Sequence, residues 1–214
     1  MARILVIGGH GKVALLLTPI LAERGDAVSA LIRNPEHARE VEARGATPVV
    51  CDVESADVDE LAALAQGLDA VVWSAGAGGG NADRTYAVDR DAAIRMMDAA
   101  LAAGAALFVM VSYFGAGADH GVPDDNPFFA YAEAKSIADQ FLRASALDWT
   151  ILAPSSLTLD EPTGEIDAEA ESAGSVSRGD VAAVIAQTLV EPRTIHRTIR
   201  FNTGRTPVAE ALQA

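Results

Sequence analysis

Positive charge and cysteine are both scarce in this chain. Its 214 residues include 16 Lys+Arg against 30 Asp+Glu, which gives a formal net charge of −14. A chain this acidic repels the phosphate backbone, so the composition excludes a nucleic-acid binder that tracks phosphates. Cys51 is the only cysteine, which excludes an internal disulfide and a thiolate zinc cluster. The four histidines lack ligand spacing, and we predict no metal site.

Long hydrophobic runs are also rare. The longest uncharged stretch, 99–118, has the length of a membrane span but is rich in alanine and glycine. A helix end, a turn at Gly104 and a buried strand explain it better than a span does. The first predicted strand begins almost at Met1, which leaves no room for a signal peptide. We therefore expect a cytoplasmic protein that makes no membrane contact.

Only two of the sixteen basic residues are lysines, and the other fourteen are arginines. Lys12 lies in a glycine-rich turn, and Lys135 follows Tyr131 by four residues. A lysine supplies a flexible point charge that arginine does not reproduce. In a chain that otherwise uses arginine, each lysine therefore marks a motif with a candidate function.

Apolar runs alternate with helical patterns along the whole chain. Hydrophobic residues make up 50% of it, which is typical of a folded domain. We predict strands at 3–7, 27–32, 48–51, 69–73, 107–111 and 149–152, a last edge strand at 198–201, and helices at 11–24, 57–66, 84–103, 128–145 and 181–190. The glycine-rich stretch 74–80 is predicted to be a loop, and the acidic segment 155–176 a loop or lid over the cleft. This order predicts one α/β domain over 1–214, a Rossmann-type doubly wound parallel sheet with a small C-terminal substrate-side lobe.

The turn after the first predicted strand has the spacing of a dinucleotide fingerprint. Glycines at its first and fourth positions allow a sharp turn and close approach of a pyrophosphate, and Ala14 allows the helix to pack close to the strand. The exposed N–H groups and the helix dipole favour an anion there. A tight strand-to-helix turn can also need glycine for structural reasons alone. The predicted cofactor-binding residues of the turn are Gly8, Gly9, His10, Gly11, Lys12 and Val13.

Arg33, at the end of the second predicted strand, favours NADP(H) over NAD(H). An NAD-binding site usually has an acid at this position for the ribose 2′-hydroxyl, whereas a 2′-phosphate calls for arginine. The alternative is a solvated arginine in a turn. Asp52 and Val53 are placed to reach the adenine, although Asp52 could instead cap the following helix. Ala75 and Gly76, after the fourth strand, complete the predicted cofactor-binding set together with Lys135.

Tyr131 and Lys135 are expected to share one face of a helix, since they are four residues apart. An ammonium beside a phenol favours the phenolate, so we predict that Lys135 lowers the pKa of Tyr131. Tyr131 would then donate or accept a proton near neutral pH. Ser112, at the end of the fifth strand, lies where ligands collect and could hydrogen-bond a substrate oxygen. Tyr131 and Lys135 could also be an ordinary helical pair.

The chain resembles the atypical short-chain dehydrogenase/reductases, and more narrowly the small NAD(P)H-binding proteins related to biliverdin reductase B and to epimerase-like proteins. The residues that carry the resemblance are Gly8-Gly9-His10-Gly11-Lys12-Val13-Ala14, Arg33-Asn34-Pro35, Val88-Asp89, Val111-Ser112, Tyr131-Ala132-Glu133-Ala134-Lys135 and Leu147-Asp148-Trp149-Thr150-Ile151-Leu152. The resemblance implies a Rossmann fold with NADP(H) along the strand ends. It also implies that the lysine contacts the nicotinamide ribose and that the serine and tyrosine polarise the substrate oxygen.

One departure from the family pattern affects the substrate. The family often has an arginine and a glycine after the sixth strand, where this chain reads Leu152-Ala153-Pro154-Ser155-Ser156. We predict an NADP(H)-dependent oxidoreductase acting on a small carbonyl, quinone or conjugated acceptor. The alternatives are a non-catalytic NADP(H)-binding redox sensor and an epimerase-like enzyme acting on a sugar. The expected partner is a small-molecule substrate, and we expect a monomer or small homo-oligomer.

Overall fold

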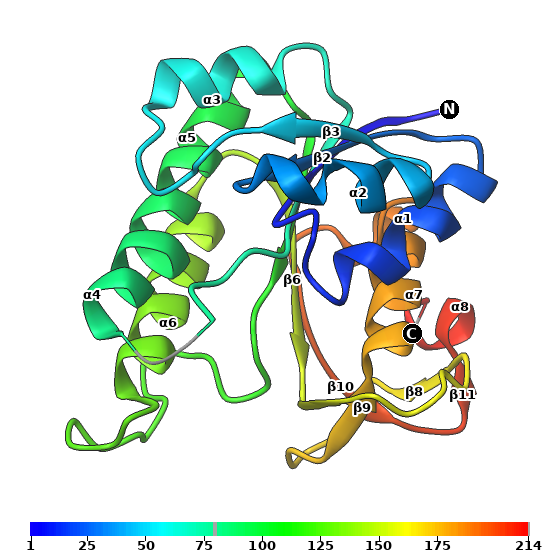
Figure 1. The fold of residues 1–214 in the computed structure, drawn as a ribbon. Coiled ribbons are helices and arrows are strands. Elements are labelled where there is room, and N and C mark those ends of the chain that lie inside the picture. Colours follow the sequence, from blue (N-terminus) through cyan, green and yellow to red (C-terminus); the bar gives the residue numbers. More distant parts are fainter. Residues whose placement is uncertain (79–80, 214) are drawn as a thin grey trace.

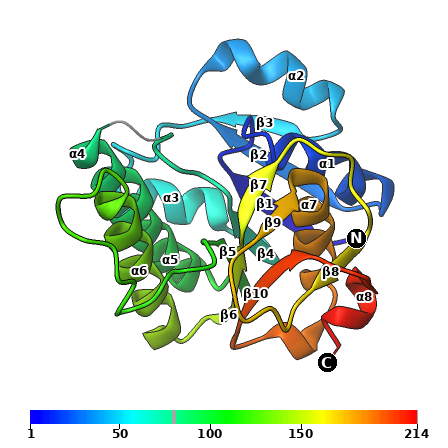
Figure 2. The same ribbon diagram turned by 90° about the horizontal axis from the view of Figure 1, so that it is seen from below.

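The computed structural model describes residues 1–78 and 81–213. Residues 79 and 80 of the predicted glycine-rich loop, and residue 214 of the predicted domain, lie outside the described residues. The described chain folds around one large sheet with helices on both faces (Figures 1 and 2). This confirms the predicted Rossmann-type α/β fold.

Seven parallel strands form the body of the sheet, in the order β3-β2-β1-β4-β5-β6-β10. Their bounds are β1 Arg3–Ile7, β2 Ala27–Ile32, β3 Thr47–Val50, β4 Ala70–Trp73, β5 Leu107–Val111, β6 Asp148–Pro154 and β10 Arg197–Thr203. The chain order reverses between β1 and β4, so ligands are expected at the carboxyl ends of these strands. Pro48 is tolerated because β3 is the edge strand of the sheet.

Two hydrophobic cores lie on opposite faces of the sheet. Strand β1 shows the division, because Ile4 and Val6 point into one core while Leu5 and Ile7 point into the other. The first core is covered by α1 (Ala14–Glu23), α2 (Ala38–Ala43), α7 (Arg178–Thr188) and α8 (Val208–Ala211). The second is covered by α3 (Val58–Ala65), α5 (Ala93–Ala103) and α6 (Phe129–Ala144). Figure 1 shows these two groups of helices on the right and left of the sheet.

The helix predicted over 84–103 is interrupted by a wider turn. It begins as α4 (Ala82–Thr85), continues as a π-helical stretch η2 (Tyr86–Ala92) and ends as α5. Such stretches are often found at functional sites, since the extra residue per turn redirects side chains. Here it includes Asp89, which is buried although its side chain is a carboxyl group.

The segment 155–176 is more regular than the predicted loop. It contains β7 (Ser156–Thr158), β8 (Glu165–Asp167) and most of β9 (Ser175–Ser177), and β7 and β9 pair as a small separate sheet. Strand β8 runs antiparallel to β10 and to β11 (Thr206–Pro207), so β10 is not the edge strand that we predicted. A side chain on Gly204 would collide with the backbone of Ile166, so this close pairing requires glycine. Strands of two or three residues carry too little periodicity to be read from sequence.

Four short helical segments also escaped prediction, namely α2, α8 and two single-turn 3₁₀ helices. η1 (Pro35–His37) leads into α2, and the Asn34 side chain accepts a hydrogen bond from the Glu36 N–H at 3.0 Å. η3 (Pro192–Thr194) follows α7. Both 3₁₀ helices begin with a proline, whose fixed φ suits the first position of a helix.

Among the helices that the structure describes, none is long and apolar enough to cross a membrane. The uncharged stretch 99–118 divides as predicted into the end of α5, a turn at Gly104 with φ of +73°, and β5.

Candidate functional site

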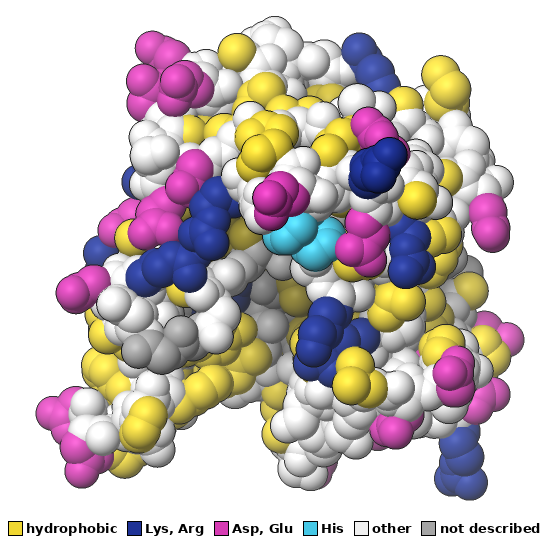
Figure 3. Space-filling view, in the orientation of Figure 1, with side chains coloured by type: hydrophobic (Ala, Val, Ile, Leu, Met, Phe, Trp, Pro, Cys, Tyr) yellow, Lys and Arg dark blue, Asp and Glu magenta, His cyan; other side chains and the backbone are white. Residues whose placement is uncertain are grey.

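A cleft of about 370 Å³ lies at the carboxyl ends of β1, β2, β3 and β4. Figure 3 shows histidine, basic and acidic side chains gathered around a hollow in this face of the molecule. The cleft is lined by most of the predicted cofactor residues, namely Gly8, His10, Gly11, Arg33, Asp52, Val53, Ala75 and Gly76. Gly9, Lys12, Val13 and Lys135 do not line it. Gly9 and Val13 are buried beside the turn, whereas Lys12 is exposed.

The glycine turn forms a tight backbone cradle at one end of the cleft. Gly8 has φ of +79°, and a Cβ on it would lie 2.7 Å from the Ala75 Cα. A Cβ on Gly9 would lie 2.6 Å from the Ala30 Cβ, and the Gly11 N–H closes the turn by donating to the Gly8 carbonyl at 2.8 Å. The turn therefore requires glycine and brings its backbone close to whatever occupies the cleft.

Helix α1 begins at Ala14, three residues later than predicted, because the turn continues through residue 13. No side chain caps this end of the helix, and Val13 occupies the capping position. Backbone carbonyls of the turn nevertheless satisfy most of the first N–H groups, since Leu15 donates to Gly11 at 2.9 Å, and Leu16 and Leu17 donate to Val13 at 3.1 and 2.9 Å. The positive end of the α1 dipole lies next to the glycine cradle, and this arrangement fits the pyrophosphate of a dinucleotide.

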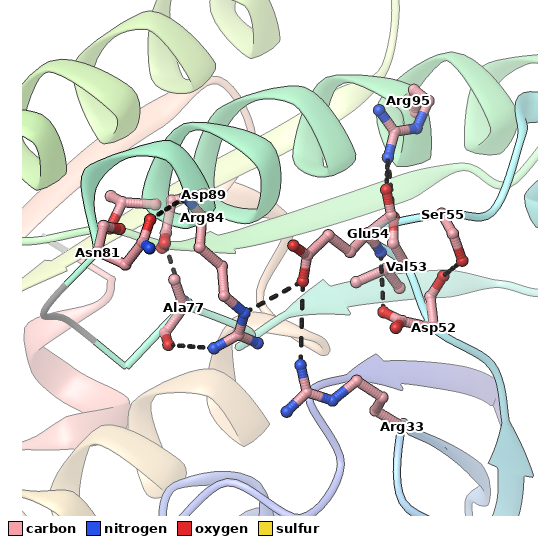
Figure 4. A network of polar contacts seen from close by, with 11 residues as sticks. Arg33, Asp52, Val53, Glu54, Ser55, Ala77, Asn81, Arg84, Asp89 and Arg95 are labelled. Atoms are coloured by element: carbon pink, nitrogen blue, oxygen red, sulfur yellow. Dashed lines mark hydrogen bonds and ion pairs between the residues drawn. The ribbon is translucent and has the colours of Figure 1, made fainter.

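Arg33 does not stand alone in the cleft. Glu54, which follows β3, lies between Arg33 and Arg84, with its Oε2 3.9 Å from Arg33 Nη1 and 3.1 Å from Arg84 Nε (Figure 4). The prediction included neither Glu54 nor Arg84. These residues are far apart in sequence, and no local pattern places them beside Arg33.

Asp52 stabilises the turn in which it lies and does not cap the helix that follows. Its Oδ1 accepts from the Glu54 N–H at 3.1 Å, while Asp57 caps α3 through a reciprocal pair with Glu60. The alternative role considered for Asp52, as the cap of this helix, is therefore wrong.

Two histidine side chains that line the cleft stack on each other. The rings of His10 and His37 lie 3.6 Å apart between centroids and are inclined by 15°. His10 Nε2 lies 2.8 Å from a carboxylate oxygen of Glu40, and this hydrogen bond lowers the pKa of Glu40. The stack connects the glycine turn to the segment that follows β2.

Ser112 and Lys135 lie in a buried polar cluster at the end of β5. The Ser112 hydroxyl donates to Asp139 Oδ2 at 2.6 Å, and Lys135 Nζ donates to the Val111 carbonyl at 2.7 Å. Asp139 and Lys135 are almost completely buried. Burial raises the pKa of Asp139, and the nearby ammonium of Lys135 opposes that rise. Asp139 was not predicted, although its position four residues after Lys135 places it on the same helical face.

Asp89 is a second buried carboxyl group that interacts electrostatically with Lys135. Its Oδ2 accepts from the Ala77 N–H at 2.9 Å and so fixes the loop after β4. Burial raises the pKa of Asp89, which Lys135 opposes. Burial also lowers the pKa of Lys135, against the effect of Asp139 and Asp89. The ammonium of Lys135 therefore interacts with two buried carboxyl groups.

The predicted lowering of the Tyr131 pKa is wrong. Burial raises the pKa of Tyr131, and the charges of Asp89 and Asp139 raise it further. Lys135 is not among the groups that shift the pKa of Tyr131, so it does not offset this rise. Tyr131 therefore stays protonated near neutral pH, so a proton is present on its hydroxyl before any transfer.

Tyr131 lies in an aromatic cluster beside a second cavity. Its ring centroid is 5.6 Å from that of Tyr113 and 5.1 Å from that of Phe128. The cavity measures about 480 Å³ and is lined by Tyr131, Phe128 and residues of α4. Because Tyr113 directly follows Ser112, the cluster connects Tyr131 to the end of β5.

We expect Asp139→Ala to destabilise the fold by about 3 kcal/mol, because it removes a carboxyl group facing the buried Lys135. It also removes the acceptor of the Ser112 hydroxyl. Asp139→Asn keeps that hydrogen-bond partner and should cost less. Urea unfolding at pH 7 measures both variants, and equal stability of Asp139→Ala and the wild type would contradict this view of the cluster.

In the part of the chain that the structure describes, no three His, Cys, Asp or Glu side chains come together in a way that could hold a metal ion. The residues that converge on this edge of the sheet are instead a glycine cradle, an arginine pair and a buried Ser–Asp–Lys cluster. This donor set suits an organic anion such as a dinucleotide.

Comparison with known proteins agrees with this geometry. Residues 8–192 match a protein family described as NAD(P)H-binding. The uncharacterized sugar epimerase YhfK of Bacillus subtilis (strain 168) is 35% identical over 215 residues, covering 99% of each chain.

Solved structures are similar over the whole chain. A Bacillus halodurans protein provisionally described as an NAD-dependent epimerase/dehydratase has a TM-score of 0.90 at 35% identity, covering 100% of this chain and 99% of its own. The oxidoreductase ylbE of Lactococcus lactis has a TM-score of 0.88 at 28% identity, covering 99% and 95%. The predicted resemblance to atypical short-chain dehydrogenase/reductases is confirmed. The chain therefore belongs to the NAD(P)H-binding family, of the oxidoreductase and epimerase-like kind, whose cofactor is a nicotinamide dinucleotide.

Proposed function

We propose that this protein is an NADP(H)-dependent oxidoreductase that reduces a small carbonyl, quinone or conjugated acceptor. The observation that carries the proposal is the position of Tyr131. It packs against Tyr113, the residue next to Ser112, beside a cavity at the same sheet edge as the glycine cradle. A proton donor, a hydroxyl and a cofactor cradle at one edge are the parts that a carbonyl reductase needs.

The glycine turn and the positive end of the α1 dipole would hold the pyrophosphate, and Arg33 the 2′-phosphate. The bound NADPH supplies a hydride. Tyr131 gives its phenolic proton to the substrate oxygen as negative charge develops there, and solvent then reprotonates the phenolate. The raised pKa keeps Tyr131 protonated before the transfer, and the more basic alkoxide that develops on the substrate drives the transfer itself.

Ser112 would orient the substrate oxygen with its hydroxyl. In the structure that hydroxyl donates to Asp139, so it must turn from the carboxylate to the substrate. Lys135 keeps the end of β5 in place through the Val111 carbonyl and offsets the charge of Asp139. Its proposed contact with the nicotinamide ribose would use another of the three N–H donors of the ammonium.

The test is consumption of NADPH, followed by absorbance, with aldehydes, quinones and enones, together with identification of the product. The expected result is one reduced product for each NADPH consumed with at least one of these classes. Binding of NADPH without consumption in the presence of any class would favour the redox sensor.

An epimerase-like function is the second candidate, favoured by the names of the relatives in the two Bacillus species. An epimerase returns its hydride to the substrate, so it consumes no cofactor overall. Interconversion of sugar isomers at constant NADP(H) would support this candidate over the reductase.

We expect Arg33→Ala to weaken NADPH binding about tenfold, since it removes a charged hydrogen-bond donor to the 2′-phosphate worth about 1.4 kcal/mol. NADH lacks this phosphate, so its affinity should change less than twofold. Calorimetric titration of both variants with both nucleotides checks this. Arg39→Ala, in α2 and outside the cleft lining, is the matched control. An equal loss for both nucleotides would contradict the assignment of Arg33.

A further inference from the structure

We propose that Glu54 competes with the 2′-phosphate of the cofactor for Arg33 and Arg84, and so sets the selectivity between NADPH and NADH. The inference deepens the proposed function, on which it rests for the position of the cofactor. It assigns Arg84 to the same anion subsite as Arg33.

Two guanidinium groups from distant parts of the chain converge on one carboxylate. Arg33 follows β2 and Arg84 belongs to α4, and both contact Glu54 Oε2, at 3.9 and 3.1 Å (Figure 4). All three residues line the cleft that also contains Gly8 and Gly11. Paired guanidinium groups are a recurrent binding site for phosphate, so the carboxylate occupies a place that a phosphate group would suit.

The backbone beneath Glu54 is fixed, which limits its movement to the side chain. Arg95 Nη2 donates to the carbonyls of Glu54 at 3.1 Å and Val53 at 2.9 Å. Asp52 accepts from the Glu54 N–H. The Glu54 side chain is 32% exposed, so it can rotate toward solvent without unfolding the turn.

Arg84 is held more firmly than Arg33. Its Nη1 donates to the Ala77 carbonyl at 2.8 Å while its Nε contacts Glu54. Arg33 is 57% exposed, and its contact with Glu54 is the longer one. A 2′-phosphate would therefore engage Arg33 first and then displace the carboxylate from Arg84.

The charges of Arg33, Arg84 and Glu54 determine whether removing Glu54 strengthens or weakens NADPH binding. With Glu54 in place, the three side chains have a net charge of about +1, and the carboxylate repels a phosphate at close range. NADH has only a hydroxyl at this position and meets no such competition. Removing the charge of Glu54 should therefore improve NADPH binding selectively.

The experiment compares Glu54→Gln with wild type by calorimetric titration of the full chain with NADPH and NADH at fixed salt. We expect the Kd for NADPH to fall about tenfold and that for NADH to change less than twofold. Glu42→Gln, which removes one charge from exposed α2 outside the cleft lining, should leave the ratio unchanged. Glu54→Asp shortens the reach to Arg33 and should shift the ratio in the same direction by less.

An unchanged or lower NADPH preference in Glu54→Gln would overturn the inference, and would show that the carboxylate aligns the arginines or contacts the ribose hydroxyl. The proposed function fails in a different way. If wild type prefers NADH, the proposed NADP(H) preference is wrong, while the shift caused by Glu54→Gln still tests the competition. If neither protein binds either nucleotide, both proposals are contradicted.

Discussion

Replacing Tyr131 by phenylalanine is expected to lower turnover by about 10²- to 10⁴-fold, the usual contribution of a positioned proton donor. The change removes one hydroxyl and keeps the ring, so the contacts with Tyr113 and Phe128 remain. NADPH affinity should stay within twofold of wild type, because Tyr131 does not line the cleft of the glycine turn. Steady-state kinetics with the best acceptor, together with NADPH titration, measure the two effects separately.

Tyr86→Phe is the matched control for this prediction. Tyr86 lies in η2 with its ring beneath the Arg90 guanidinium, 4.8 Å from the ring centroid, and does not line the second cavity. It should retain full turnover. A loss below tenfold in Tyr131→Phe would remove Tyr131 from the chemistry, and a redox sensor should be insensitive to both changes.

Gly8→Ala should reduce affinity for both nucleotides by about 100-fold or more. Its φ of +79° already strains any other residue by about 1 kcal/mol, and the new methyl group would lie 2.7 Å from the Ala75 Cα and 2.9 Å from the Ala75 nitrogen. Both partners are backbone atoms, so the glycine turn and the loop after β4 must move apart. Both segments line the cleft, so its shape is lost when they separate.

Gly25→Ala is the matched control, because it introduces the strain of a positive φ without a collision between the new methyl group and neighbouring atoms. Gly25 has φ of +86°, follows α1 and has no atom within 4 Å of an added Cβ. It should lose a similar amount of stability from the positive φ but bind NADPH as wild type does. Calorimetric titration and thermal unfolding of both variants measure the two effects. If Gly8→Ala binds NADPH with an affinity within tenfold of wild type, the assignment of the glycine turn as the pyrophosphate site is contradicted.

Local patterns in the sequence were sufficient for the fold and for half of the site. β-branched runs located the parallel strands, and the glycine spacing located the turn that requires Gly8. The spacing of Tyr131 and Lys135 placed both on α6, as the structure shows. Each of these features depends on residues that are close together in the chain.

Features that depend on distant residues could not be predicted. Glu54 and Arg84 join Arg33 only because β2, β3 and α4 meet at one edge, and sequence spacing gives no sign of this. The direction of the Tyr131 pKa was missed because it is set by burial and by Asp89 and Asp139, not by the helical neighbour Lys135. Electrostatics in a buried site depend on every nearby charge, so a pair considered alone gives the wrong sign.

The central claim is that the cleft at the glycine turn binds a nicotinamide dinucleotide through its pyrophosphate and its 2′-phosphate. The most direct measurement is calorimetric titration of cofactor-free wild-type protein with NADPH and then with NADH at fixed salt. The account predicts binding of one NADPH per chain with a lower Kd than that for NADH. Equal affinity would remove Arg33 from the site, and binding of neither nucleotide would contradict the claim.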